Sequence, residues 1–386
     1  MGRFRDALAA PGLGAIAEIK RRSPSAGDLR PDADPARLAA QFANAGASAV
    51  SILVDERFGG SLDDLRAARS ATAVPLLAKG FFTEELQLLQ AKVGGADAVL
   101  LLLRDLDDPA AAAMLSYGRE LGLDALVEAH DADELHRAVA LEAAVVGVNA
   151  RDLSTFELDR RAQLELVARV RHHDPLIVAE SGIHSRAQGA AAEVAGADAI
   201  LVGSALMRAA DPAAKLTEIL SRPLVKVCGL TRQQDVDVAV DAGADMLGFI
   251  LAEQSPRRAA GVLDVPDDRL SVAVFVGEAK DVGSDLVQLY AREEGRVRGR
   301  KAQLLRDGEP VARVVDLPWE GEDPLHLQRA AATEGRVMLA GRLGPDNVRE
   351  AVRAVRPWAV DAASRLETAP GIKDHDKVRA FVAQAR

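Results

Sequence analysis

One pattern recurs along the chain and limits its fold more than any other feature. In each copy a glycine ends an amphipathic segment and an aliphatic run follows, as in AGASAVSILV at 45–54, GGADAVLLLL at 94–103, AGADAILVGS at 195–204 and AGADMLGFIL at 242–251. Glycine suits the left-handed conformation that ends many helices. Strands with little polar alternation are buried on both faces, as parallel strands covered by helices are. The pattern therefore predicts helices that return to a parallel sheet.

Eight aliphatic runs, separated by helix-like stretches, occupy residues 15–204. They begin at residues 15, 49, 74, 98, 124, 144, 176 and 199. Eight strand–helix units predict a closed barrel, which we assign to residues 1–222. The alternative is an open doubly wound sheet, but no Gly-rich dinucleotide-binding loop follows the first run.

A second series of runs begins at residue 224, after the chain-breaking SRP at 221–223. We count seven runs there, and residues 223–386 fall short of the roughly 200 residues of a small eight-stranded barrel. The predicted fold class is therefore α/β, with two (β/α)8 TIM-type barrels in tandem. We expect the second barrel, residues 223–386, to be shortened. The sequence leaves both a closed and an incomplete barrel as alternatives.

The charge and composition of the chain restrict its partners. The formal net charge of the 386 residues is -10, and no basic stripe interrupts the acidic background, so nucleic acid is not an expected partner. A single cysteine forms no internal disulfide, and the amino terminus lacks a long apolar run, so we expect no membrane segment and a cytoplasmic, reducing compartment. No two histidines have metal-site spacing. We predict no metal, no cofactor and a monomer.

Polar side chains stand where the first eight aliphatic runs end. In barrels of this type, working residues lie at the carboxyl ends of the strands and on the loops that follow. Any one of these side chains, taken alone, is explained as a solvated charge at the rim of the barrel. The regular placement of the whole set favours convergence on one site. The positions are Glu18, Lys20, Lys79, Glu128, Asn149, Arg151, Glu180, Ser181, Gly203 and Ser204.

Lysines and carboxylates in one site suit acid–base work on a carbonyl substrate. We expect a partly desolvated lysine near another cation to have its pKa lowered towards neutrality. The SGI and VGS segments that end the seventh and eighth runs match the phosphate-binding position of such barrels. Arg21, Arg22 and Arg151 are candidates for binding a second anion. The residues thus predict a small phosphorylated, acyclic sugar derivative as substrate. We assign no chemical role to His130.

Seven segments together resemble indole-3-glycerol-phosphate synthase over nearly all of residues 4–220. They are AEIKRRSPSAG, SILVDERFGGSLDDL, LLAKGFF, VEAHD, VGVNARDLSTFELD, VAESGI and LVGSALMR, in the family's order. The resemblance implies ring closure of 1-(2-carboxyphenylamino)-1-deoxyribulose 5-phosphate with loss of carbon dioxide and water, a carboxy-lyase reaction of tryptophan biosynthesis.

The resemblance also implies a role for each matching residue. Lys79 is the general acid at the carbonyl and Glu128 the base for dehydration, with Lys20 assisting. Three further side chains position the substrate: Glu18, Asn149 and Glu180. The substrate and its phosphate are implied to contact Ser23, Phe58, Arg151, Ser181, Gly182, Gly203 and Ser204.

Three features depart from the family's pattern. Gly80 stands where the family typically has an aspartate beside the catalytic lysine, so the tuning of Lys79 is expected to differ. Ala26 stands where lysine is common. Members usually carry an amino-terminal extension that helps cover the site, whereas seventeen residues precede Glu18 here, which leads us to expect weaker closure over substrate.

The second half resembles phosphoribosylanthranilate isomerase through VKVCGLTRQQDVDVAVDAGADMLGFILAEQSPRR, AVFVG, VQLY, LAGRLGPDNV and ETAPGIKD. The resemblance implies that Cys228 is a general base and that Arg257 belongs to the site. The general acid does not map cleanly, and Asp316 is the best candidate. A helix is missing between AVFVG and VQLY, and between VQLY and LAGR there is room for one strand where the family has two. Further departures are Tyr290 for a histidine and two glycines replaced by Arg342 and Arg365.

Three functional hypotheses follow from these residues. The first is a bifunctional enzyme that also catalyses the Amadori isomerisation of phosphoribosylanthranilate. The second, which we favour, is a synthase whose second domain has weak isomerase activity or none. The third is a generic sugar-phosphate isomerase or aldolase with a Schiff-base lysine, for which Lys79 and Lys20 are the candidates.

Overall fold

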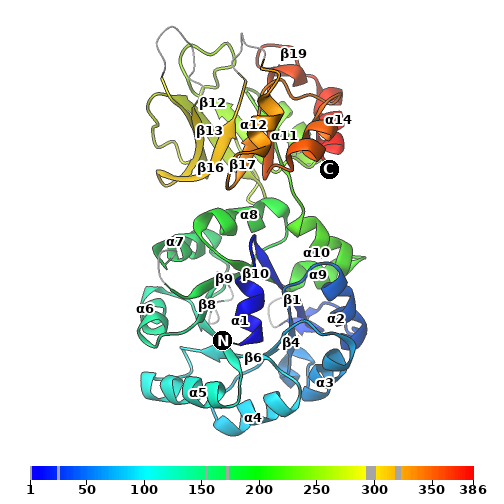
Figure 1. Ribbon diagram of the computed structural model, residues 1–386, viewed down its shortest axis with the longest axis vertical. Coiled ribbons are helices and arrows are strands. Elements are labelled where there is room, and N and C mark those ends of the chain that lie inside the picture. Colours follow the sequence, from blue (N-terminus) through cyan, green and yellow to red (C-terminus); the bar gives the residue numbers. More distant parts are fainter. Residues whose placement is uncertain are drawn as a thin grey trace. The chain divides into compact units, whose positions relative to one another are not determined.

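Two compact units make up the chain. The computed structural model describes residues 2–23, 27–152, 155, 157–170, 174–292, 301–317 and 323–386. Residues 1–184 and 189–220 form the first unit, and residues 185–188 and 221–386 form the second. Each unit is built around a closed barrel of eight strands (Figure 1), so the prediction of two tandem barrels is confirmed.

The first barrel has only parallel neighbours. Every strand predicted from the eight aliphatic runs is present, with small shifts at the ends. In the order in which they neighbour each other, the strands are β1 (Gly14–Ile19), β10 (Ala199–Val202), β9 (Leu176–Glu180), β8 (Val145–Asn149), β7 (Asp124–Ala129), β6 (Ala98–Leu102), β5 (Leu76–Lys79) and β4 (Ala49–Leu53).

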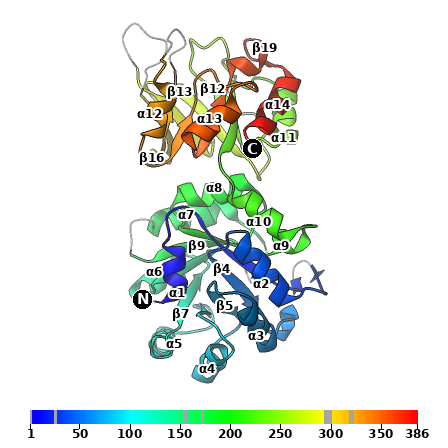
Figure 2. The same ribbon diagram turned by 45° about the vertical axis from the view of Figure 1, so that its right-hand side comes forward.

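Helices surround this barrel, as Figures 1 and 2 show. Their starts are set by short polar residues, such as Asp34, whose carboxylate accepts hydrogen bonds from the first turn of α2. The helices are α1 (Arg3–Leu8), α2 (Pro35–Asn44), α3 (Leu62–Ala71), α4 (Glu85–Val93), α5 (Asp108–Glu120), α6 (Ala132–Ala140), α7 (Arg160–Val170), α8 (Arg186–Ala195), α9 (Ser204–Arg208) and α10 (Pro212–Leu220), with a short 3-10 helix η1 (Glu56–Phe58). A small hairpin joins β2 (Arg22–Ser23) to β3 (Gly27–Asp28).

The amino-terminal end of the first barrel is closed by α1. Phe4 and Leu8 on this helix are buried and pack with barrel-interior side chains such as Ile16, Leu126 and Val178. The backbone N–H of Phe4 donates to the carboxylate of Asp124, the first residue of β7, over 3.0 Å. A plugged amino-terminal end leaves the carboxyl ends of the strands as the place for a site.

The second barrel closes with eight strands rather than the seven that we counted. The strand missed from the sequence is β15, which hydrogen-bonds to both of its neighbours in antiparallel fashion. In barrel order the strands are β11 (Leu224–Cys228), β12 (Met246–Ile250), β13 (Leu270–Val276), β14 (Leu286–Tyr290), β15 (Ala302–Arg306), β16 (Glu309–Val315), β17 (Val337–Leu339) and β18 (Ala359–Ala362). The second barrel is therefore closed, but by a hairpin where a parallel unit was expected.

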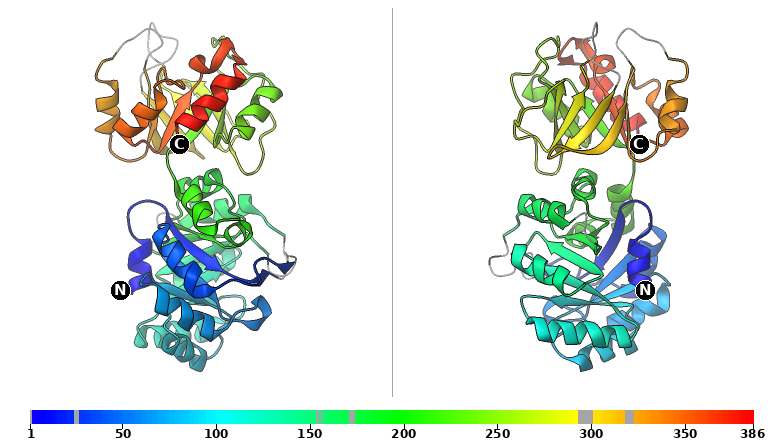
Figure 3. Two further views of the ribbon diagram at one scale, coloured as in Figure 1. Left: turned by 90° about the vertical axis from the view of Figure 1, so that its right-hand side faces the viewer. Right: turned by 60° about the vertical axis from the view of Figure 1, so that its left-hand side comes forward.

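The second barrel has fewer helices than the first. The helix predicted to be missing between β13 and β14 is indeed absent from the described residues 277–285. The right-hand view of Figure 3 shows the yellow strands without a helix in front of them. The helices are α11 (Gln233–Asp241), α12 (His326–Ala331), α13 (Val348–Val355) and α14 (His375–Gln384), with a 3-10 helix η2 (Ser364–Leu366) and a hairpin of β19 (Glu367–Ala369) and β20 (Ile372–Lys373).

Across the described residues, every helix is too short or too polar to cross a membrane.

Candidate active site

The carboxyl ends of four strands of the first barrel bring one lysine and three carboxylates together. Lys79 ends β5, and its Nζ lies 2.8 Å from Oε2 of Glu180, the last residue of β9. The same nitrogen is 3.4 Å from Oε1 of Glu18 on β1 and 3.8 Å from Oε2 of Glu128 on β7. Lys20 lies beside this group, with its Nζ 2.5 Å from Oε2 of Glu18. The convergence predicted for these residues is present.

The surroundings raise the pKa of Lys79 rather than lower it, so our expectation of a lysine tuned towards neutrality was wrong. Burial alone would lower its pKa, but Glu180, Glu18 and Glu128 outweigh burial. The second cation, Lys20, does not reverse this balance because it contacts Glu18 directly. Lys79 is therefore a protonated, hydrogen-bonded acid in the unliganded protein.

The buried carboxylates differ in protonation because their partners differ. Burial would raise the pKa of Glu128, but His130, Lys79 and Asn149 lower it to about 2. Burial and the neighbouring Glu128 raise the pKa of Glu180 to about 8, although Lys79 opposes them. Two carboxylates with pKa values pushed apart are typical of sites that use one as a base and another as a hydrogen-bonding acid.

One carboxylate oxygen of Glu128 accepts a hydrogen bond, and the other accepts none from the described residues. Its Oε1 accepts a hydrogen bond from Nδ2 of Asn149, the last residue of β8, over 3.0 Å. Asn149 is itself oriented by the backbone N–H of Arg151, which donates to its Oδ1 over 3.0 Å. Oε2 of Glu128 is buried and accepts no hydrogen bond from the described residues. That oxygen is therefore available to take up a proton.

Two glycines make room for the carboxylates. A Cβ atom on Gly203 would lie 2.1 Å from Oε2 of Glu18, and one on Gly147 would lie 2.1 Å from Oε1 of Glu180. Gly80, where the resemblance led us to note a missing aspartate, is also tight, because its Cβ would lie 2.9 Å from a methyl group of Val54. A side chain at position 80 would therefore require the residue after β4 to shift.

The expected phosphate-binding residues follow β9 and β10. Ser181 and Gly182 directly follow Glu180, and both have positive φ angles, 69° and 70°. Gly203 precedes α9, which begins at Ser204. A Cβ on Gly203 would be 3.2 Å from Nζ of Lys20, so this turn and Lys20 border the same space.

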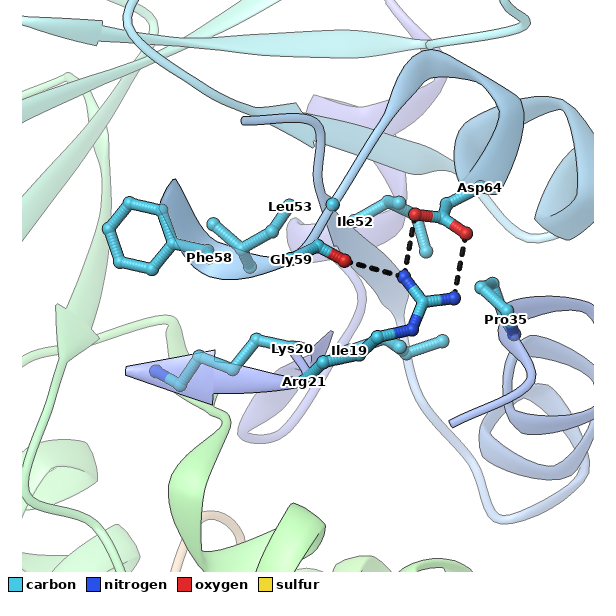
Figure 4. Close-up of a pocket in the computed structure, with 10 residues that line it drawn as sticks. Ile19, Lys20, Arg21, Pro35, Ile52, Leu53, Phe58, Gly59 and Asp64 are labelled. Atoms are coloured by element: carbon cyan, nitrogen blue, oxygen red, sulfur yellow. Dashed lines mark hydrogen bonds and ion pairs between the residues drawn. The ribbon is translucent and has the colours of Figure 1, made fainter. Parts of the chain in front are cut away.

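A small pocket beside Lys20 is lined by Phe58 and Gly59 (Figure 4). The Phe58 ring stacks against that of Phe81, with the ring centroids 6.2 Å apart. Figure 4 shows Lys20 extending towards Phe58, whereas Arg21 turns towards Asp64.

Arg21 is not available for the second anion that we expected it to bind. Its guanidinium forms two hydrogen bonds with the carboxylate of Asp64, over 2.7 and 2.8 Å, and donates to the carbonyl oxygen of Gly59 over 2.7 Å. The side chain therefore ties the first strand to the loop before α3. Arg22 is exposed, Ser23 is partly exposed at the end of β2, and Arg151 follows β8. Ala26 lies outside the described residues.

In the second barrel, Cys228 ends β11 and is buried. Burial and Asp361 raise the pKa of its thiol, and Lys226 and Lys373 only partly offset them. A Cβ on the next residue, Gly229, would lie 3.2 Å from Cδ of Arg257 and 3.5 Å from Nζ of Lys373. The structure therefore brings Arg257 to the end of the strand that carries Cys228.

Asp316 belongs to a chain of hydrogen bonds that runs across the second barrel. Its Oδ2 accepts a hydrogen bond from the Tyr290 hydroxyl over 2.7 Å, and Nε2 of Gln288 donates to that hydroxyl over 2.8 Å. Oε1 of Gln288 accepts from Nζ of Lys226 over 2.7 Å, and this nitrogen is 3.1 Å from Oδ2 of Asp361. The tyrosine that replaces a histidine thus binds the candidate acid directly.

The two arginines that replace glycines also contact each other. Arg342 has a φ of 55°, a conformation that glycine adopts readily and that costs other residues free energy. Arg365 donates to its carbonyl oxygen over 3.3 Å and forms an ion pair with Asp346 at 2.7 Å. Arg365, which stands where the resemblance places a phosphate-binding glycine, is therefore held by the backbone of Arg342 and by Asp346.

Comparison with known proteins identifies the family of the first barrel. The family model for indole-3-glycerol phosphate synthase matches residues 2–219, more than half of the chain. The chain belongs to this family. The family model for N-(5'-phosphoribosyl)anthranilate isomerase matches residues 323–384. The chain thus joins a synthase domain to an isomerase-like domain, as the sequence motifs indicated.

Relatives of both kinds are similar to the chain. The synthase of Mycobacterium ulcerans is 44% identical over 56% of this chain and 79% of its own length. The multifunctional tryptophan biosynthesis proteins of Phycomyces blakesleeanus and Schizosaccharomyces pombe are each 31% identical and cover 96% and 95% of this chain. This chain spans 62% and 58% of their lengths. A crystal structure of phosphoribosyl anthranilate isomerase is 27% identical with a TM-score of 0.34, and covers 42% of this chain and 98% of its own.

Two features of the chain, one in each barrel, were missed from the sequence. His130 lies 3.1 Å from Oε1 of Glu128, although we had assigned it no chemical role. Its position two residues after Glu128, with Glu134 one helical turn later, was the available signal. The buried pair of Lys226 and Asp361 was also missed, because a lysine inside an aliphatic strand gives no indication of its partner.

Proposed function

We propose that the first barrel converts 1-(2-carboxyphenylamino)-1-deoxyribulose 5-phosphate into indole-3-glycerol phosphate, releasing carbon dioxide and water. The observation that carries this proposal is the position of Lys79, whose ammonium nitrogen lies within 3.8 Å of carboxylates from three different strands. The three carboxylates keep Lys79 protonated, so it carries a proton that it can transfer to a ketone oxygen bound beside it. Family membership and the 44% identity to a bacterial synthase give independent support.

The reaction assigns a task to each charged group. Lys79 donates a proton to the carbonyl oxygen as the aromatic ring carbon bonds to the carbonyl carbon, and the carboxyl group then leaves as carbon dioxide. Glu128 removes a proton from the substrate during dehydration, through its open Oε2. Lys20 donates the proton with which the hydroxyl group leaves as water, while Glu18, Asn149 and Glu180 hold the lysines and the base in place.

The phosphate and the aromatic carboxylate bind on opposite sides of this cluster in our proposal. Backbone N–H groups of the turns that contain Gly182 and Gly203 bind the phosphate, together with the hydroxyls of Ser181 and Ser204. Arg151 binds the carboxylate, and Ser23 and Phe58 border the aromatic ring. The stacked rings of Phe58 and Phe81 offer an apolar surface for that ring.

The test is direct turnover of this substrate by the purified full-length chain. Lys79→Ala and Glu128→Gln are each expected to lower kcat by about 10²–10⁴-fold, the usual contribution of a positioned acid or base. Lys92→Ala, on the outer helix α4, is the matched control and should retain wild-type turnover. Near-normal turnover by Lys79→Ala would refute the assignment. Borohydride trapping of substrate on Lys79 or Lys20 would favour the Schiff-base alternative instead.

For the second domain we propose an isomerase activity that is weak or lost, with domain borders at 1–222 and 223–386. Support comes from the raised thiol pKa of Cys228 and from the hydrogen bond that ties Asp316 to Tyr290. The change from the first compact unit to the second after residue 220 supports this border. A base that is mostly protonated near neutral pH is poorly suited to abstracting a proton.

Full bifunctionality is the second candidate, because the barrel closes and retains Cys228 beside Lys373 and Arg257. Complementation of bacterial auxotrophs distinguishes the bifunctional enzyme from a synthase with an inactive second domain. The chain should rescue a bacterial strain that lacks the synthase and fail to rescue one that lacks the isomerase. Rescue of the second strain, abolished by Cys228→Ser, would establish the bifunctional enzyme.

A further inference from the structure

His130 is clamped between two glutamates at the edge of the proposed synthase site. It directly follows β7, two residues beyond Glu128, and 14% of its side chain is exposed. Its Nε2 lies 3.1 Å from Oε1 of Glu128, an ion-pair distance without hydrogen-bond geometry, and its Nδ1 lies 3.0 Å from Oε2 of Glu134, within hydrogen-bond distance. A carboxylate beside each ring nitrogen favours the charged form of the imidazole, in which both nitrogens carry a proton.

Helix α6 fixes this ring in place. Oε2 of Glu134 also accepts the backbone N–H of His130 over 2.8 Å, so one carboxylate oxygen holds both the backbone and the ring. Glu134 is anchored in turn, because its own N–H donates to the carboxylate of Asp131 at the start of α6 over 2.8 Å. Arg137 is the charged neighbour that acts on Glu134 from the same helix. The first turn of α6 therefore holds His130 rigidly against Glu128.

Each buried glutamate of the site has a different nearest cation. Glu18, Glu128 and Glu180 are all buried, and Lys20 lies closest to Glu18, 2.5 Å away. Lys79 lies closest to Glu180, at 2.8 Å, and is 3.8 Å from Glu128. The nearest cationic partner of Glu128 is thus His130. Burial would lower the pKa of His130, but Glu128 and Glu134 raise it to about 10.

We propose that His130 is a positioning residue, held as an imidazolium ion, that keeps Glu128 ionised and oriented while Lys79 remains bound to Glu180. The inference rests on the proposed synthase reaction and extends it to a residue with no direct part in the chemistry. The proton removed from substrate goes to Oε2 of Glu128, and His130 retains both of its own. Lys79 is then free to engage the substrate carbonyl without leaving Glu128 uncompensated.

The test is the pH dependence of kcat/KM for His130→Gln, whose amide keeps one hydrogen-bond donor but carries no charge. Losing the imidazolium raises the pKa of Glu128, so the acidic limb should move to higher pH by about one unit or more. At the acidic end the variant should then be at least about 10-fold slower than wild type, and on the alkaline plateau nearly as fast. The control is His136→Gln, which changes an exposed histidine on α6. It should leave the pH profile of kcat/KM unchanged.

A merely structural role for His130 predicts a different result. It would lower kcat/KM by the same factor at every pH and leave the acidic midpoint in place, which would overturn the proposal. A second measurement needs no variant: the ¹⁵N chemical shifts of His130 in the wild-type protein should show both ring nitrogens protonated at pH 8. A neutral ring at that pH would also overturn the proposal.

The two measurements separate this inference from the proposed function. If the wild-type chain fails to form indole-3-glycerol phosphate, the proposed function fails, and the ring titration alone then decides whether His130 is charged. If the wild-type chain is active and the ring is neutral at pH 8, the proposed function stands and the role of His130 is refuted.

Discussion

Oε1 of Glu180 lies where a side chain at position 147 would begin, because a Cβ atom on Gly147 would be 2.1 Å from it. Gly147 lies within β8 and Glu180 ends β9, the neighbouring strand. The absence of a side chain on one strand thus determines where the carboxylate of the next can reach. The cluster around Lys79 depends on this space as much as on the charged residues themselves.

Gly147→Ala should therefore displace Glu180 and reduce synthase turnover. Overpacking of a filled core costs about 1–3 kcal/mol of stability, and we expect kcat/KM to fall at least about 10-fold because a misplaced acid or base loses much of its contribution. Gly189→Ala is the control, since its Cβ would meet Ile200 at an ordinary 3.5 Å. Steady-state kinetics and thermal unfolding of both variants check the prediction. A Gly147→Ala enzyme with wild-type kinetics would show that Glu180 can move without consequence.

His130 should also make stability depend on pH in the alkaline range. Its pKa is about 10 in the folded protein and near 6.5 when unfolded, so its contribution is complete below about pH 6.5 and is lost as pH rises through about 10. Hydrogen bonds to charged groups contribute about 1.5–3 kcal/mol. His130→Gln should be less stable than wild type by about that amount at pH 6, and the difference should shrink by pH 10. Urea unfolding at several pH values measures it, and a constant difference would contradict the charged state.

Cys228 should react slowly with thiol reagents in the folded protein. It is 4% exposed, and burial raises its pKa, so both access and thiolate fraction are low at neutral pH. We expect labelling by Ellman's reagent to be more than about 10-fold slower than in denaturant, where the thiol regains its ordinary pKa. Because the chain has a single cysteine, the absorbance change reports this site alone. Equal rates in the two conditions would place the thiol at the surface.

Lys226→Met should destabilise the second domain. Lys226 is fully buried, its Nζ lies 3.1 Å from Asp361, and removing one partner of a buried ion pair costs about 3–5 kcal/mol. Both tryptophans, Trp319 and Trp358, lie in the second half of the sequence, so tryptophan fluorescence follows this domain during urea unfolding. The double variant Lys226→Met with Asp361→Asn should recover part of the loss. An unchanged unfolding midpoint in the single variant would mean that the pair contributes nothing.

The first barrel could be predicted almost completely from the sequence, whereas the second could not. β6 is aliphatic throughout and β4 is aliphatic except for Ser51, and both are buried on both faces, so the strands stand out. β15 has the sequence AQLLR, with Gln303 exposed and Arg306 partly exposed. Antiparallel strands with one solvated face carry such polar residues, and the expectation of a parallel unit hid the strand.

The site was predicted in its residues but not in its electrostatics. The strand-end rule placed Glu18, Lys79, Glu128 and Glu180 together correctly. The direction of the Lys79 pKa shift depends on three distances of 2.8, 3.4 and 3.8 Å, which no linear sequence specifies. Arg21 likewise looked available until Asp64 was seen to bind it. The sequence identifies which groups meet, while their separation decides which group holds the proton.

The β15–β16 hairpin gives the second barrel a turn at the end opposite the rim that carries Cys228. β14 and β16 both run parallel to the rest of the barrel, so the reversed β15 carries the chain back to the amino-terminal end, where exposed Asp307 and Gly308 make the turn. Asp316 then returns to the rim at the end of β16. An affinity tag, a fluorescent reporter or new chain termini could therefore be introduced at 307–308 without entering the space around Cys228.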